Sequence, residues 1–110
     1  MISADLLEKL LAFRREREWE QFHTPKNLSA AICTEAAELL EHFRWARDSE
    51  LSELVARERA NIESEIADVA IFMTYLCHDL NVSLNEVVER KLEANRAKYP
   101  VEKARGNAAK

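Results

Sequence analysis

The chain has 110 residues, of which 47% are apolar and 33% are charged, and this composition is typical of one globular domain. It contains one glycine and two prolines, which argues against strand-rich folds because their many turns require such residues. The net charge of −4 argues against nucleic acids and anionic membranes as partners. These features predict an all-helical domain with short connections.

The two cysteines and the apolar runs indicate in which cellular compartment the protein is expected. Neither cysteine has zinc-site spacing, and both lie in apolar helical stretches, where a free thiol behaves as a small hydrophobe. Charged residues at positions 5, 8 and 9 interrupt the apolar character that a signal peptide needs. The longest nearly apolar run, residues 69–77, is about half a membrane span. We therefore expect a reduced, cytoplasmic protein.

Periodicity and capping residues divide the N-terminal half into two predicted helices. Ser3 can cap a first helix over residues 4–21, in which apolar side chains share one face. Thr24 is a capping residue and Pro25 a first helical residue for a second helix, which runs to about Trp45. The segment between the two helices is expected to be a short connection.

The C-terminal half contains two more helical segments. A third helical region covers residues 50–80, with an expected break near residues 57–59. A capping box at Ser83 opens a fourth helix, which a proline ends. Residues 101–110 resemble a loose polar tail, so residues 1–100 are expected to form the domain.

Carboxylates lie on the apolar faces of two of these helices. At about 100° per residue, Glu35 falls about 20° from Leu28, and Glu38 lies at the edge of the same arc. Glu65 and Asp68 lie beside the apolar stripe of the third helix. Buried carboxylates are rare unless they are paired or bound to metal. Each i, i+3 pair shares one helix face, so packing the two helices together brings four carboxylates around one point.

Four negative charges at one site require cations, and all-oxygen ligation is typical of Mg²⁺ and Mn²⁺. Lys91 and Asn95, within the apolar stripe of the fourth helix, are candidates to contact phosphate. Two alternatives stay open: the carboxylates can belong to a solvated face, and Lys91 can extend its ammonium group into solvent. A di-iron site is disfavoured, because only Glu20-x-x-His23 has the required spacing and it runs into a loop.

The third helix also predicts a partner. Between residues 66 and 77 only Asp68 is charged, and apolar residues occur on every side. A helix that is apolar all round is buried all round. An isolated monomer would leave one side of it exposed, so we expect a second subunit.

Four ordered blocks of the sequence carry a specific resemblance. They are EWEQFHTPKNL at residues 18–28, EAAELLEHFRW at 35–45, EIAD at 65–68 and KLEANRAKYP at 91–100. The chain resembles the MazG-like, all-α nucleoside triphosphate pyrophosphatases over residues 10–100, most closely their small dCTP pyrophosphatase branch. It departs from longer members at Thr34, where they carry glutamate, and from mammalian members at Leu10 and Phe72, where they carry histidine and tyrosine.

The resemblance implies a four- to five-helix bundle completed by oligomerisation, as a homodimer or homotetramer. It implies hydrolysis of a nucleoside triphosphate, with dCTP favoured, to the monophosphate and pyrophosphate in nucleotide-pool house-cleaning. Mg²⁺ would be the cofactor, with Mn²⁺ able to substitute. The implied metal ligands are Glu35, Glu38, Glu65 and Asp68. The implied phosphate contacts are Lys91, Asn95, Arg96 and Tyr99, and the implied base-binding residues are Trp19, His23, Trp45 and Phe72.

In the mechanism that this implies, water attacks the α-phosphorus and either Glu35 or Glu38 accepts its proton. Two rival functions stay open. One is the same fold acting on another phosphoanhydride, such as dUTP or phosphoribosyl-ATP. The other is a non-catalytic helical interaction module.

Overall fold

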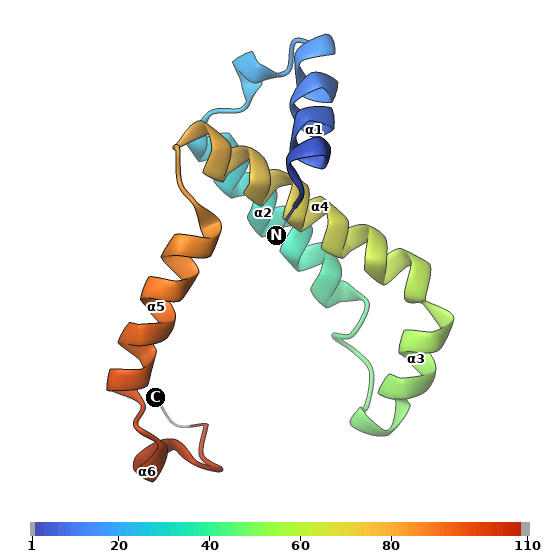
Figure 1. The fold of residues 1–110 in the computed structure, drawn as a ribbon. Coiled ribbons are helices and arrows are strands. Elements are labelled where there is room, and N and C mark those ends of the chain that lie inside the picture. Colours follow the sequence, from blue (N-terminus) through green and yellow to red (C-terminus); the bar gives the residue numbers. More distant parts are fainter. Residues whose placement is uncertain (1, 109–110) are drawn as a thin grey trace.

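The computed structural model describes residues 2–108, and this part of the chain is helical, without strands (Figure 1). The predicted all-helical class is confirmed. Within residues 2–108, six α-helices are joined by short connections, two of which contain single turns of 3₁₀ helix at Glu20–Phe22 and Asp48–Glu50. The α-helices are α1 (Ala4–Glu16), α2 (Pro25–Glu41), α3 (Leu51–Arg57), α4 (Arg59–Asp79), α5 (Leu84–Lys98) and α6 (Val101–Ala104). None of the helices within residues 2–108 has the length and hydropathy that crossing a bilayer requires.

Helices α2 and α4 lie side by side and antiparallel, and they form the centre of the fold (Figure 1). The buried apolar side chains are Leu28 on α2 and Ile62 and Tyr75 on α4. Thr24 caps the N-terminus of α2 as predicted, because its hydroxyl accepts a hydrogen bond from the amide of Asn27. This antiparallel pair carries all four predicted metal ligands.

The first helix is shorter than predicted, because it ends at Glu16 instead of residue 21. Glu18 adopts a left-handed conformation with φ of 55°, while the amides of Glu18 and Trp19 donate to the carbonyls of Arg15 and Arg14. These two hydrogen bonds form a Schellman motif, which satisfies the last carbonyls of the helix and reverses the chain. Trp19 therefore leaves the helix and turns back toward Phe13, with the two ring centroids 5.7 Å apart.

Two other boundaries differ from prediction, and one is confirmed. Helix α2 ends at Glu41, because the carbonyls of its last turn accept from nearby amides in tighter turns, so Trp45 lies outside the helix. The expected break near residues 57–59 is confirmed at Glu58, between α3 and α4. The loose tail is wrong for residues 101–104: the carbonyl of Pro100 accepts two amide hydrogen bonds and starts α6. Residues 109–110 of that tail lie outside the described residues.

Helix α5 projects away from the α2–α4 pair (Figure 1). The hydroxyl of Ser83 caps it, as predicted, by accepting from the amide of Glu86. The middle of its apolar stripe is exposed among residues 2–108: Val88 is 56% exposed and Leu92 is 48% exposed. The radius of gyration is 17.5 Å, whereas a compact domain of this length has about 13 Å. The single chain therefore does not enclose its own apolar surface.

Candidate active site

Three of the four predicted metal ligands meet at one point between α2 and α4. Glu35, Glu38 and Glu65 each present a carboxylate oxygen, and these oxygens lie within 4.8 Å of one another. The i, i+3 spacing places the first two on one face of α2, and the antiparallel packing of α4 adds the third. We call Glu35, Glu38 and Glu65 the acidic cluster.

The acidic cluster is electrostatically strained. The pKa of Glu35 is raised to about 7, first by burial, then by its hydrogen bond with Glu38 and by the charges of Glu38, Asp68 and Glu65. One oxygen each of Glu35 and Glu65 is buried without a hydrogen-bond partner among residues 2–108. Buried carboxylate oxygens without partners are uncommon. A divalent cation with oxygen ligands would satisfy both atoms and neutralise the repulsion, so the donor set fits Mg²⁺ or Mn²⁺.

A histidine that was not assigned to the site lies beside the acidic cluster. The Nε2 atom of His42 is 3.9 Å from a carboxylate oxygen of Glu65, and both side chains are largely buried. On a helical wheel at about 100° per residue, His42 falls between Glu35 and Glu38. That position was the available signal, but a histidine there reads equally well as an ordinary polar contact.

Asp68, the fourth predicted ligand, lies next to the acidic cluster and lines an aromatic pocket. Its charge contributes to the raised pKa of Glu35. The aromatic pocket is a cavity of about 430 Å³ between α1, the two residues that flank the 3₁₀ turn at Glu20–Phe22, and α4. Its walls include Asp68 and five ring-bearing side chains, Phe13, Trp19, His23, Phe72 and Tyr75. The acidic and aromatic parts of the site are thus contiguous.

The rings of the aromatic pocket contact one another around His23. The centroid of its imidazole is 5.3 Å from that of Tyr75, 6.3 Å from that of Phe72 and 6.5 Å from that of Trp19. The pKa of His23 is lowered by burial and then by the positive charge of Arg14. Its buried Nδ1 atom has no hydrogen-bond partner among residues 2–108. A neutral imidazole among aromatic rings can stack on a planar ligand and also hydrogen-bond to it.

Three of the four predicted base-binding residues, Trp19, His23 and Phe72, line the aromatic pocket. Two further aromatic residues there, Phe13 and Tyr75, were missed. Tyr75 follows Phe72 by one turn of α4, a spacing that could have indicated it. Helical periodicity could not indicate that Phe13 lines the pocket, because its ring contacts Trp19 only after the chain reverses at the end of α1.

The single chain does not bring the remaining predicted residues to this site. Trp45 is 80% exposed and its ring lies under the guanidinium of Arg44. Of the four predicted phosphate contacts, Lys91, Asn95 and Arg96 lie on α5, and Tyr99 directly follows this helix. Among them, Arg96 pairs with Glu93, and no hydrogen bond or ion pair joins any of the four to the acidic cluster within residues 2–108.

Fold and site together define an all-helical protein with a carboxylate cluster beside an aromatic pocket. The chain belongs to the MazG-like family, whose sequence profile matches residues 30–110. It is 41% identical over 100 residues to dCTP pyrophosphatase 1 of Mus musculus and 40% identical to that of Homo sapiens. These matches cover 89% of this chain but 59% of each relative, so the chain spans about three fifths of their length.

The fold has a close counterpart among solved structures. A crystal structure of a pyrophosphatase from Archaeoglobus fulgidus superposes with a TM-score of 0.84 and is 45% identical in sequence. The match covers 87% of this chain and 90% of the other. The two proteins therefore share the same arrangement of helices.

Proposed function

We propose that the protein is a Mg²⁺-dependent nucleoside triphosphate pyrophosphohydrolase that converts a deoxynucleoside triphosphate, with dCTP favoured, to the monophosphate and pyrophosphate. One observation carries the proposal: Asp68 lies between a carboxylate cluster and an aromatic pocket. A nucleotide needs both environments, because its phosphates require cations and its base stacks on rings. The names of the relatives support the same activity and the same substrate.

Glu35, Glu38, Glu65 and Asp68 would hold the metal. Bound Mg²⁺ would withdraw charge from the phosphate oxygens and stabilise the pyrophosphate leaving group, and Mn²⁺ would do the same. The protein's own part is to place oxygen ligands on two packed helices, so that they need no rearrangement when the nucleotide arrives.

Water attacks the α-phosphorus in this mechanism, and Glu35 or Glu38 accepts its proton. Both carboxylates lie on the same face of α2, at the centre of the acidic cluster. The aromatic pocket would orient the nucleotide by stacking its base, with Trp19, His23 and Phe72 in the roles that the family resemblance implies. Because Asp68 lines the pocket and its charge acts on Glu35, a base bound in the pocket would lie near the proposed metal site.

A second copy of the chain is proposed to complete the site. The phosphate contacts Lys91, Asn95, Arg96 and Tyr99 belong to the projecting helix α5 or its end. An apolar cavity of about 270 Å³ lies beside the start of α5, lined by Leu39, Ile66, Val69, Met73 and Leu84 among others. A homodimer, or a homotetramer built from two such dimers, would cover this cavity and bring α5 and Trp45 of one chain toward the cleft of another.

Product analysis tests the proposed bond cleavage. With Mg²⁺ and dCTP, we expect dCMP and pyrophosphate in equal amounts, measured by ion-exchange chromatography and a pyrophosphate-coupled assay. Release of dCDP and orthophosphate would show attack at the γ-phosphorus and contradict the proposal. The same assay with dUTP and phosphoribosyl-ATP separates the rival substrates, and Mg²⁺ binding without turnover of any of them would favour the interaction module. The cytoplasmic location stays a prediction.

Removing a ring from the aromatic pocket is expected to weaken substrate binding. Stacking on one aromatic side chain contributes about 1–3 kcal/mol per base, so Phe72→Ala should raise the KM for dCTP roughly 5- to 150-fold. Steady-state kinetics would measure this increase. Phe22→Ala is the matched control, because Phe22 is an exposed ring that does not line the pocket. Equal KM values for the parent and Phe72→Ala would exclude this cavity as the base site.

A further inference from the structure

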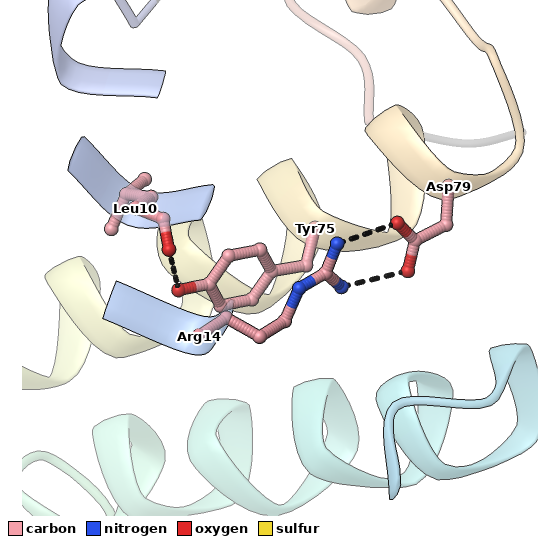
Figure 2. A network of polar contacts seen from close by, with 4 residues as sticks. All are labelled: Leu10, Arg14, Tyr75 and Asp79. Atoms are coloured by element: carbon pink, nitrogen blue, oxygen red, sulfur yellow. Dashed lines mark hydrogen bonds and ion pairs between the residues drawn. The ribbon is translucent and has the colours of Figure 1, made fainter. Parts of the chain in front are cut away.

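A polar network outside the acidic cluster connects α1 to the end of α4 (Figure 2). Arg14 on α1 is only 4% exposed, and two of its guanidinium nitrogens donate to the two carboxylate oxygens of Asp79, each at 2.8 Å. The partners are 65 residues apart in the sequence. Two parallel charge-assisted hydrogen bonds fix direction as well as distance, so this pair restricts how α1 lies on α4.

Tyr75 joins the same network through both its hydroxyl and its ring. It is 3% exposed, and its hydroxyl donates a 2.7 Å hydrogen bond to the carbonyl of Leu10 on α1. The central guanidinium carbon of Arg14 lies over the tyrosine ring, 4.6 Å from its centroid (Figure 2). Three contacts therefore meet at one place between the two helices. We call Arg14, Tyr75 and Asp79 the latch.

The latch adjoins the aromatic pocket because Tyr75 belongs to both. Its ring lines the pocket and lies 5.3 Å from the imidazole of His23. On the opposite wall, α1 contributes Leu10 and Phe13. Among the described residues α1 packs chiefly against α4, so few other contacts hold this wall in place. Helices α1 and α4 both line the pocket, and the latch joins these two helices beside it.

We propose that Arg14, Tyr75 and Asp79 are positioning residues that hold α1 against α4 at the spacing needed to clamp a nucleobase between the two walls of the aromatic pocket. This inference rests on the proposed function for the identity of the ligand, and it adds residues that touch no phosphate or metal. Burial lowers the pKa of His23, the positive charge of Arg14 lowers it further, and the negative charge of Asp79 acts in the opposite direction.

Tyr75→Phe is the sharpest test, because it keeps the ring and removes only the hydroxyl that binds α1. Arg14→Lys keeps the charge but removes the paired hydrogen bonds to Asp79. Arg15→Lys is the matched control, since Arg15 is an exposed neighbour outside the latch. Two readouts are needed: amide hydrogen exchange along residues 4–16, and KM and kcat for dCTP and dATP with Mg²⁺.

If the proposal is correct, Tyr75→Phe and Arg14→Lys each accelerate amide hydrogen exchange in α1 about two- to tenfold, because each variant loses hydrogen bonds to or from α1. Amide hydrogen exchange in α2 should stay unchanged. The KM for dCTP should rise about three- to tenfold, kcat should stay within about twofold, and the preference between dCTP and dATP should narrow. A purely structural role would lower the melting temperature and leave KM and base preference unchanged, which would overturn the proposal. Unchanged exchange in α1 would overturn it too. If the parent hydrolyses no nucleotide, the proposed function fails, whereas the exchange of α1 still decides whether the latch exists.

Discussion

Replacing Glu38 by glutamine, or Asp68 by asparagine, is expected to remove most turnover while leaving the metal-free protein at least as stable as the parent. Each amide keeps the shape of the side chain but lacks the charge that a hard cation requires. Loss of groups that only support a metal ligand costs about 10- to 100-fold in activity, so loss of a ligand should cost at least about 100-fold. Initial rates with saturating Mg²⁺ would measure the loss.

The stability of the same variants distinguishes a metal ligand from a salt-bridge partner. If the carboxylate formed a stabilising ion pair, replacing it by the neutral amide would lower the melting temperature of the protein. In the acidic cluster, burial and then the neighbouring carboxylates raise the pKa of Glu35 to about 7, so removing a neighbouring charge relieves part of this strain. The metal-free variants should therefore melt at or above the parent temperature. Added Mg²⁺ should stabilise the parent more, by up to about 2.7 kcal/mol at a hundred times the Kd.

Glu41→Gln is the matched control for both measurements. Glu41 lies on the same helix, but it is exposed and pairs with Arg44 at the surface, where such ion pairs contribute little. Its substitution should change neither turnover nor the response to Mg²⁺. Near-parental activity of Glu38→Gln would show that the metal site has been assigned to the wrong residues.

The raised pKa of Glu35 also predicts a pH dependence of the stability of the metal-free protein. Because the pKa of Glu35 is raised from 4.5 to about 7, the stability linked to this group is fully present below pH 4.5. It is lost as the pH rises through about 7, where the folded protein must ionise Glu35 beside other carboxylates. Thermal melts between about pH 4.5 and 8 should show this decline, and Glu35→Gln should reduce it.

The second large effect concerns assembly: we expect no stable monomer at micromolar concentration. The chain exposes 8816 Å², whereas a compact monomer of 12.7 kDa exposes about 6,200 Å². The surplus of about 2,600 Å² exceeds the roughly 800 Å² that each partner buries in a standard interface. Sedimentation velocity should show a dimer or tetramer. A well-folded monomer would contradict the expectation, and with it the proposed contribution of α5 from a second copy.

A charged side chain on the apolar stripe of α5 should disrupt this assembly. Leu92→Glu places a carboxylate on the stripe, and we expect it to shift the protein toward monomer and to lower activity, because α5 carries the proposed phosphate contacts. Ala97→Glu is the matched control, since it adds the same charge to the opposite side of α5, about 140° from Leu92. Sedimentation and dCTP turnover of the two variants should differ. Equal oligomeric states would place the interface elsewhere.

Several features of the candidate site follow from the sequence alone. The i, i+3 spacing put Glu35 and Glu38 on one face of a helix, and the apolar residues around them showed that this face is turned inward. Helical periodicity is a local property, since each residue turns by about 100° relative to its neighbour whatever surrounds it. The capping residues Ser3, Thr24 and Ser83 were readable for the same reason, because a cap bonds to an amide three residues away.

Other features were decided only by the tertiary structure. The left-handed Glu18 ends α1 early, and no local preference indicated it, because glutamate rarely adopts that conformation. The turn brings Trp19 to Phe13, which a continuous helix would have kept apart. The pairing of Arg14 with Asp79 spans 65 residues, and it depends on how α1 packs against α4.

The sequence by itself therefore determined the helical class, which depends on composition, and the grouping of four carboxylates in two pairs, which depends on spacing within one helix. Three rings of the pocket were predicted from the family's motifs. The tertiary structure decided that the acidic cluster and the aromatic pocket share Asp68, that the latch exists, and that α5 projects with the middle of its apolar stripe exposed. Those relations join helices that are distant along the chain. Their geometry arises from side-chain packing over the whole fold, which no local pattern encodes.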